Sequence, residues 1–189
     1  MAKIYKYKDY EEYVEWQTKT NKSKITWTFV REDVINKLAK LSPDAKNIIC
    51  HGTRNGTEQK HFLKNFPDAY IVGTEISDTA TQFEMTVQHD FMEQREEWIE
   101  KFDIVYSNSF DHSIRPEDTL AVWKQQLNQN GHLFLEYSEQ QSECIPQDPL
   151  DAKLSEVERW VVEAGFSNVE IVRGIRGKNN SCVVHGVKQ

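Results

Sequence analysis

Hydrophobic residues recur along the chain with two different spacings, and the wider one is typical of helices. Near the start, Tyr10, Tyr13 and Val14, followed by Gln17, show the i, i+3, i+4, i+7 spacing of one helix face. Phe62 and Leu63 are expected to point inward from one such helix, and another carries Trp98 and Ile99. This spacing, with its stop signals, predicts helices over residues 9–20, 31–41, 57–66, 93–102, 116–128 and 154–164.

Short apolar runs between these segments predict strands over residues 47–50, 70–74, 85–88, 103–107, 132–136, 169–172 and 182–187. Strands that alternate with helices favour a parallel sheet covered on both faces. Only the short Gly/Asn-rich segment 173–181 separates the last two strands, which therefore form an antiparallel hairpin. We predict an α/β fold: a doubly wound, mostly parallel seven-stranded sheet with a C-terminal antiparallel hairpin.

Length and composition fit one folded domain. The chain has 189 residues, of which 38% are hydrophobic and 28% charged. We expect a single domain, with residues 1–42 as an N-terminal helical cap and residues 43–189 as the core.

Charge and cysteine content narrow the expected partners and compartment. The net charge of -7 disfavours nucleic acid, and no apolar run approaches the roughly 20 residues that span a bilayer. The three cysteines form no Cys-x-x-Cys pair, and the first residues lack the apolar centre of a signal peptide. We therefore expect a cytoplasmic protein with neither a nucleic-acid nor a membrane partner.

Candidate chemistry follows the predicted strands, because ligands of open parallel sheets bind beyond the carboxyl ends of the strands. The first strand is followed by His51-Gly-Thr-Arg-Asn-Gly56, where glycines permit a sharp turn and a close approach to a ligand. Glu75 follows the second strand, nineteen positions after Gly56, where an acid can accept hydrogen bonds from both hydroxyls of an adenosine ribose. An ordinary turn and a surface acid are the alternatives.

Two further strand ends carry polar or aromatic groups. Asp90 and Phe91 follow the third strand and could contact an adenine, or they could be a helix cap and a core residue. The fourth strand runs into Ser107-Asn-Ser-Phe-Asp-His112, which also has the composition of a turn.

In this order, these segments resemble those of class I S-adenosylmethionine-dependent methyltransferases, which have a Rossmann-like fold. The resemblance runs from Pro43 to the C-terminus and includes the glycine turn, Glu75, Phe102-Asp-Ile-Val-Tyr-Ser107, Leu127-Asn-Gln-Asn-Gly-His-Leu-Phe-Leu135 and the closing hairpin. It implies S-adenosylmethionine as the cofactor and methyl transfer to an acceptor that the sequence does not identify. Since the chain has no large additional domain, we expect that acceptor to be a small molecule.

The resemblance also implies a role for individual residues. The turn that contains Gly52, Thr53, Arg54 and Gly56 would face the methionine part of the cofactor. Glu75 would bind the ribose and Ile76 would pack on the adenine, which Asp90 and Phe91 would also contact. The remaining cofactor residues, which would lie under the sulfonium, are Ser107, Asn108 and Ser109.

The chain departs from the family pattern at two positions. Cys50 stands where the family usually has an acid, and Arg54 replaces the middle glycine. Arg54 could bind the methionine carboxylate or fill the pocket. A catalytically inactive binding module is therefore an alternative. A nicotinamide-dependent oxidoreductase is another, although the Gly-x-Gly-x-x-Gly pattern is incomplete.

Methyl transfer mainly requires that donor and acceptor are held in line, and a base is needed only if the acceptor loses a proton. His112 is the predicted base, with His51 as the second candidate. Glu136, Tyr137 and the loop 138–150 are expected at the acceptor site, and the N-terminal helix either covers the cofactor or packs on the sheet. We predict no metal site, because Asp111-His112 alone offers too few ligands.

Overall fold

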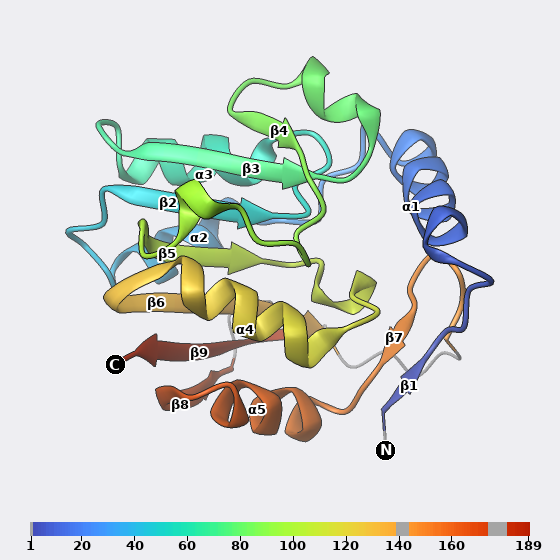
Figure 1. The fold of residues 1–189 in the computed structure, drawn as a ribbon. Helices are drawn as coiled ribbons and strands as arrows, with labels where there is room; N and C mark the ends of the chain where they lie inside the picture. Colours follow the sequence, from blue (N-terminus) through green and yellow to red (C-terminus); the bar gives the residue numbers. More distant parts are fainter. Residues whose placement is uncertain (1, 139–143, 174–180) are drawn as a thin grey trace.

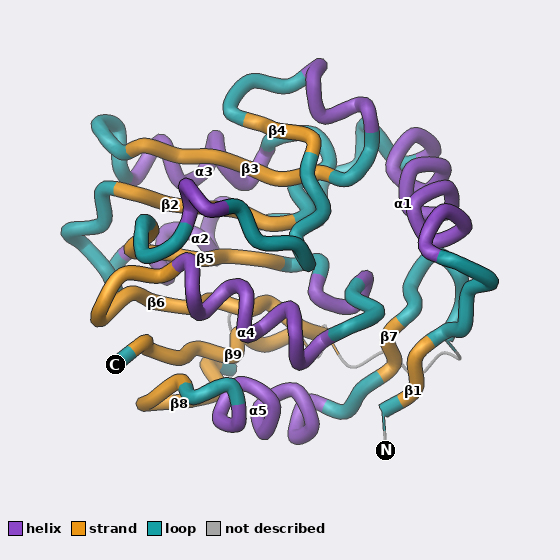
Figure 2. Tube along the Cα trace, in the orientation of Figure 1, coloured by secondary structure: helices purple, strands orange, loops and turns teal. Residues whose placement is uncertain are grey.

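The computed structural model describes residues 2–138, 144–173 and 181–189, and its centre is the seven-stranded sheet that the sequence predicts. Figures 1 and 2 show this sheet with helices on both faces. The strand order is β4-β3-β2-β5-β6-β9-β8. The strands are β2 (Asn47–His51), β3 (Tyr70–Glu75), β4 (Thr86–Gln88), β5 (Phe102–Ser107), β6 (Leu127–Ser138), β8 (Phe166–Val172) and β9 (Ser181–Lys188).

The first five strands of this sheet run parallel, and the last two pair with each other as an antiparallel hairpin, as predicted. β2 pairs in parallel with both β3 and β5. β9 pairs antiparallel with β6 and with β8, so that it lies between them. The link that joins the two hairpin strands falls largely in residues 174–180, outside the described residues.

Alternate residues of the central strands enter two separate cores. Ile49 and Val105 pack on the face covered by α4 (Pro116–Gln126) and α5 (Leu154–Glu163). Ile48 and Ile104 pack on the opposite face, covered by α2 (Glu32–Ala39) and α3 (Thr57–Asn65). Because successive side chains of a strand point to opposite faces, a sheet covered on both sides produces the continuous apolar runs seen in the sequence.

The N-terminal segment closes over the carboxyl end of the parallel strands. Helix α1 (Tyr10–Ser23) lies beyond the tips of β2 and β3 (Figure 1). Asp9 caps this helix by accepting a hydrogen bond from the Glu12 backbone N–H at 2.9 Å. Before it, β1 (Lys3–Ile4) pairs with β7 (Leu150–Asp151), so the start of the chain is attached to a segment near residue 150.

Two expectations about helices are wrong. Residues 93–102 do not form a helix but contain only the short 3₁₀ helix η2 (Glu96–Trp98), with Ile99 49% exposed. Residues 93–97 are all polar, and Phe102 begins β5, so Trp98 and Ile99 have no apolar partners one turn earlier with which to form a helix face. In α3, Phe62 is buried as expected, but Leu63 is 37% exposed because it lies on the outer side.

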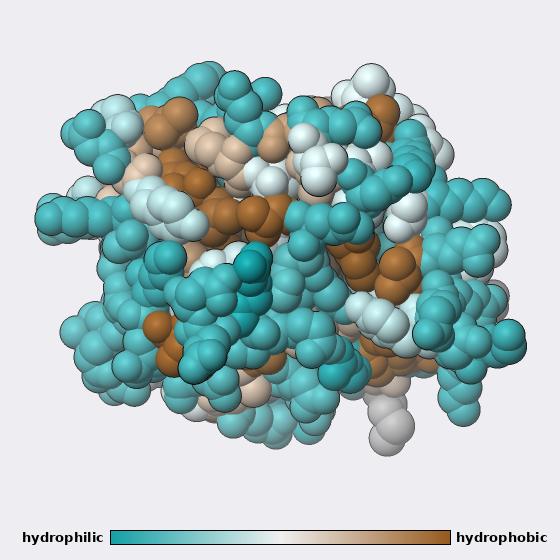
Figure 3. Space-filling model, turned by 45° about the horizontal axis from the view of Figure 1, so that its top comes forward, coloured by the Kyte–Doolittle hydropathy of each residue, from teal (hydrophilic) through white to brown (hydrophobic). Residues whose placement is uncertain are grey.

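The surface is predominantly polar. Figure 3 shows hydrophilic side chains over most of one face, with apolar side chains visible mainly where that face is recessed. In the described parts of the chain, no helix combines the length and the apolar character needed to span a bilayer.

Candidate functional site

The turn after β2 has the backbone conformation of a glycine-rich loop, although one of its glycines is replaced. Gly52 and Gly56 have φ values of 72° and 74°, and Arg54 has a φ of 43°. A Cβ atom on Gly52 would lie 2.6 Å from the Ser109 Cβ, so the position also has no room for a side chain. The Ser109 hydroxyl donates to the Gly52 carbonyl at 3.0 Å and thereby joins this turn to the end of β5.

Glu75 ends β3 directly beside this turn, and its carboxylate is held by backbone donors. One oxygen accepts from the Arg54 N–H at 3.2 Å, and the other accepts from the Ser77 N–H at 2.9 Å. Burial raises the pKa of Glu75, whereas the Ser77 hydrogen bond opposes that shift. The carboxylate lies at the carboxyl edge of the sheet, where the sequence predicts it.

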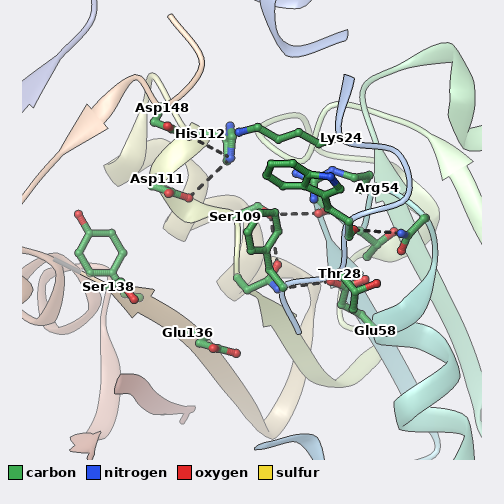
Figure 4. A pocket seen from close by; sticks show the side chains of 17 residues that line it. Lys24, Thr28, Arg54, Glu58, Ser109, Asp111, His112, Glu136, Ser138 and Asp148 are labelled. Atoms are coloured by element: carbon green, nitrogen blue, oxygen red, sulfur yellow. Dashed lines mark hydrogen bonds and ion pairs between the residues drawn. The ribbon is translucent and has the colours of Figure 1, made fainter. Parts of the chain in front are cut away.

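Two adjoining cavities open at this edge and share Gly52, Arg54, Ser109 and His112. The smaller, of about 50 Å³, lies between Glu75 and α1, and its wall includes Ile76, Asp90 and Phe91. The larger, of about 270 Å³, is shown in Figure 4, and its wall includes Thr53, Glu58, Asn108, Glu136 and Asp148. Gly56 and Ser107 line neither cavity.

Helix α1 forms a wall of the smaller cavity through Tyr13, Gln17, Thr20 and Asn21. Its Tyr10 hydroxyl donates to the Asp90 carboxylate at 2.6 Å, which connects the helix to the end of β4. The geometry therefore fits both expectations for this helix: it covers the smaller cavity, and its Tyr13 is also buried in the core on that side of the sheet. Trp16, expected in its aromatic wall, lines neither cavity.

Phe91 and Ser107 also have structural contacts that explain their burial. The Phe91 carbonyl accepts a hydrogen bond from the Trp123 indole at 3.0 Å. The Ser107 hydroxyl donates to the His51 carbonyl at 3.1 Å. Phe91 thus contributes to both the core and the smaller cavity, whereas Ser107 supports the neighbouring turn from below.

His51 is a core residue and does not face either cavity. Its Nε2 lies 2.8 Å from the Gln126 Oε1, its Nδ1 lies 3.0 Å from the Thr74 hydroxyl, and its ring stacks on Trp123 at 4.9 Å. Burial lowers its pKa to about 3. With both nitrogens engaged and no access to the cavities, the structure does not place His51 as a base.

His112, by contrast, lines both cavities. It ends the 3₁₀ helix η3 (Phe110–His112), and its Nδ1 lies 2.8 Å from the Gln17 Oε1. Its Nε2 points towards Asp111 and Asp148 (Figure 4). Of the predicted acceptor loop, Ser138 and Asp148 line the larger cavity, while residues 139–143 lie outside the described part of the chain.

Glu58 is a site residue that the sequence did not indicate, because an acid in the first turn of a helix is common on electrostatic grounds. It is only 6% exposed, and its Oε1 accepts from the Asn108 amide at 3.3 Å. Among the described residues, its Oε2 has no hydrogen-bond partner. Burial raises the pKa of the Glu58 carboxyl from 4.5 to about 7. Nearby, Glu136 accepts from the Tyr106 hydroxyl at 2.8 Å.

Arg54 lies at the junction of the two cavities (Figure 4). Its guanidinium carbon is 5.0 Å from the centre of the Phe29 ring. Within the described residues, its Nε atom is buried without a hydrogen-bond partner. This leaves a donor at the point where the cavities meet.

The sequence matches no protein-family model and no curated protein. Solved structures, however, share the fold. The 1,6-didemethyltoxoflavin-N1-methyltransferase of Burkholderia thailandensis, crystallised with its substrate and S-adenosylhomocysteine, has 13% identity and a TM-score of 0.75 over 98% of this chain and 92% of that one.

Two further structures show the range of proteins with this fold. A SAM-dependent methyltransferase from Thermotoga maritima, described as a possible histamine N-methyltransferase, has 13% identity and a TM-score of 0.64 over 96% of this chain and all of that one. A [4+2]-cyclase has 12% identity and a TM-score of 0.65 over 83% and 80% of the two chains. The predicted resemblance to class I methyltransferases is therefore confirmed as a likeness of fold.

Proposed function

We propose that this chain binds S-adenosylmethionine and transfers its methyl group to a small-molecule acceptor. The observation that carries the proposal is the position of Glu75 and the Gly52–Gly56 turn, which border two connected cavities at the carboxyl edge of the sheet. Open α/β sheets bind ligands at this edge. Structures with this fold have been solved with S-adenosylhomocysteine, which supports the choice of ligand.

In this proposal, the smaller cavity takes the adenosine and the larger takes the methionine end and the acceptor. Glu75 accepts from the ribose hydroxyls, Ile76 and Phe91 pack near the adenine, and Asp90 accepts from its amino group. Thr53, Arg54, Asn108 and Ser109 surround the amino-acid end. Gly52 and Gly56 give the turn its shape, and Ser107 supports it.

The methionine end carries both charges of an amino acid, and the larger cavity offers a partner for each. Arg54 provides a guanidinium for the carboxylate. Glu58 has an oxygen without a partner among the described residues, and it can accept from the ammonium group. Burial raises the pKa of the Cys50 thiol and the charge of Glu58 adds to this shift, so the Glu58 carboxyl group is near the position where the family usually has an acid.

Catalysis then consists mainly of holding the acceptor in line with the sulfonium methyl group. If the acceptor carries a proton, His112 is the predicted group to accept it, and Glu58 is a carboxyl group in the same cavity that could also do so. The assignment of His112 as the base stays a prediction.

A binding module without transferase activity is the second candidate. The smaller cavity, at about 50 Å³, is well below the roughly 300 Å³ of the smallest typical ligand pockets, and Arg54 borders it. The fold also supports other reactions, since a [4+2]-cyclase has it. Cofactor binding and methyl transfer therefore have to be measured separately.

The first test is calorimetric titration of the purified protein with S-adenosylmethionine and S-adenosylhomocysteine, with NADH as the control ligand. We expect micromolar dissociation constants for both sulfur ligands and no binding of NADH. Glu75→Ala should weaken binding at least tenfold, because a ribose loses its charge-assisted acceptor. Glu75→Gln keeps a side-chain oxygen that can accept from the Arg54 or the Ser77 N–H. It therefore checks that the loss of ligand binding in Glu75→Ala does not come from unfolding.

The matched control is Glu84→Ala, which removes an exposed acid that lines neither cavity. It should bind like the wild type. Absence of binding to both sulfur ligands would refute the proposal, and binding of NADH alone would favour an oxidoreductase. Binding without S-adenosylhomocysteine production across an acceptor screen would favour the binding module.

A further inference from the structure

Three potential metal ligands from separate parts of the sequence meet in the larger cavity. His112 Nε2 lies 3.9 Å from an Asp111 oxygen and 3.8 Å from an Asp148 oxygen. One ligand atom from each of the three residues lies within 4.8 Å of the other two. The sequence shows only the neighbours Asp111 and His112, and the fold adds Asp148 from thirty-six positions further along the chain.

Hydrogen bonds outside this cluster determine which nitrogen of His112 faces the carboxylates. The Gln17 amide nitrogen donates to the Pro146 carbonyl at 3.2 Å, which requires that the Gln17 oxygen be turned towards His112. That oxygen is 2.8 Å from Nδ1, so Nδ1 carries the proton and donates. In a neutral imidazole, Nε2 is then an unprotonated acceptor.

The Nε2 position and the two carboxylates can therefore share one positive charge, which is either a proton on Nε2 or a metal ion held between the three groups. A histidine that binds a metal through one nitrogen characteristically donates from the other to an oxygen acceptor, as His112 does to Gln17. The orientation of His112 is therefore that of a metal ligand.

Backbone contacts hold the three residues in place. The His112 N–H donates to the Ser109 carbonyl at 3.1 Å, and its own carbonyl accepts from the Tyr13 hydroxyl at 3.2 Å. Asp148 lies in a turn closed by hydrogen bonds in both directions with Ile145, directly before the segment that pairs with β1. The positions of these residues therefore depend on η3, on α1 and on the pairing of β1 with β7.

We propose that Asp111, His112 and Asp148 form a binding site for a divalent transition-metal cation at the acceptor end of the larger cavity. One imidazole and two carboxylates suit Mn²⁺, Fe²⁺ or Zn²⁺ better than Mg²⁺, which prefers oxygen ligands alone. The side chains of Asp111, His112 and Asp148 are 21%, 19% and 26% exposed, so the cation keeps open coordination positions that face the cavity.

The site also suggests a class of acceptor, and this step rests on the proposed function. A cation with open positions binds an acceptor oxygen, such as a hydroxyl or enol, and favours its deprotonated form. His112 then acts as a ligand and not as the base. Among the described residues, Lys24 and Arg54 are the lysine and arginine side chains that line the same cavity, and they can compete with a metal ion for the carboxylates.

The test is metal binding by the full chain after chelator treatment, followed by Mn²⁺ titration with detection of free Mn²⁺ by electron paramagnetic resonance. Mn²⁺ is chosen because it has little affinity for thiols, and Cys144 is partly exposed. We expect one site per chain. Asp148→Asn and Asp111→Asn, which keep the side-chain shape, should each weaken binding at least tenfold. Asp118→Asn, an exposed change in α4, should leave it unaltered.

Gln17→Leu tests the orientation argument and should weaken Mn²⁺ binding about tenfold, as loss of a ligand's outer partner does. Thermal unfolding monitored by circular dichroism confirms that each variant is folded. A wild-type dissociation constant above 1 mM for both Mn²⁺ and Zn²⁺ would overturn the site, as would wild-type affinity in Asp148→Asn. The metal titration contains no cofactor and the cofactor titration contains chelator, so the two proposals fail independently.

Discussion

Glu58 is a buried acid whose burial in the site has an electrostatic cost. Its carboxyl group is buried, and its pKa is raised to about 7 against 4.5 for the free group. The unfolded chain therefore releases this proton at a lower pH than the folded chain does. Its contribution to folding becomes unfavourable as the pH rises from about 4.5 to about 7, and is constant at higher pH.

Glu58→Gln removes this titration. The stability of the variant relative to the wild type should increase by ~2 kcal/mol between pH 5 and pH 8, because only the wild type has to bury a group that the unfolded chain ionises. Urea unfolding at both pH values measures the difference. Glu84→Gln, on the exposed surface, should show no such change. Parallel pH dependence in the wild type and in Glu58→Gln would contradict the raised pKa.

The turn between β2 and α3 keeps the shape of a glycine-rich loop, although Arg54 stands where the family pattern has a glycine. Arg54 adopts a φ of 43°, in the left-handed region that favours glycine, where a side chain costs about 1 kcal/mol or more. The turn is nevertheless retained, since Gly52, Gly56 and the hydrogen bond from Ser109 hold it on both sides. We attribute the tolerance of this strain to a role of the guanidinium in binding.

Arg54→Gly separates the backbone from the side chain. The variant should be ~1 kcal/mol more stable, and should bind S-adenosylhomocysteine at least tenfold more weakly because the ligand carboxylate loses its partner. 5′-Methylthioadenosine, which lacks that carboxylate, should bind with unchanged affinity. Calorimetry with both ligands measures the effect.

Asn130→Gly is the control for Arg54→Gly, since Asn130 has a φ of 64° and lies at a turn within β6, away from both cavities. Asn130→Gly should change neither the affinity for S-adenosylhomocysteine nor the affinity for 5′-methylthioadenosine. Tighter binding of both ligands to Arg54→Gly would show instead that the arginine side chain obstructs the pocket.

For the molecule as a whole, the arrangement of α1 over the sheet edge links ligand binding to the N-terminal segment. The helix reaches the site through Tyr10, Tyr13 and Gln17, and the smaller cavity lies directly beneath it. A nucleoside cannot enter about 50 Å³ unless this segment moves. Binding should therefore displace α1 and then stabilise it against the ligand.

Hydrogen exchange measured by mass spectrometry tests this coupling. At S-adenosylhomocysteine concentrations near 100 times the dissociation constant, amides of α1 should exchange at least tenfold more slowly, because the ligand stabilises the closed state. Amides of β9, in the interior of the sheet, should change little. Glu75→Ala, which weakens binding at least tenfold, should reduce this protection by about tenfold or more at the same ligand concentration. Equal protection throughout the chain would argue against a local cover.

Local patterns in the sequence determined most of the fold. The change from helical spacing to short apolar runs placed all seven strands of the main sheet, and the short link 173–181 required the closing hairpin. The expected helix at residues 93–102 was wrong, because its first five residues are polar and its few apolar residues do not form a face over successive turns. Because parallel strands bring their carboxyl ends together, the predicted strand ends also indicated that Glu75 and the Gly52–Gly56 turn lie at one edge of the sheet.

Only the tertiary structure decided which distant side chains meet there. Gln17, His112 and Asp148 come from three segments whose proximity depends on the pairing of β1 with β7 and on the position of α1. Likewise, Glu58 has the sequence context of an exposed helix start and becomes a buried acid only through the packing of α3 against the sheet. Periodicity follows from neighbours in the sequence, whereas burial and side-chain orientation depend on residues far apart in the chain.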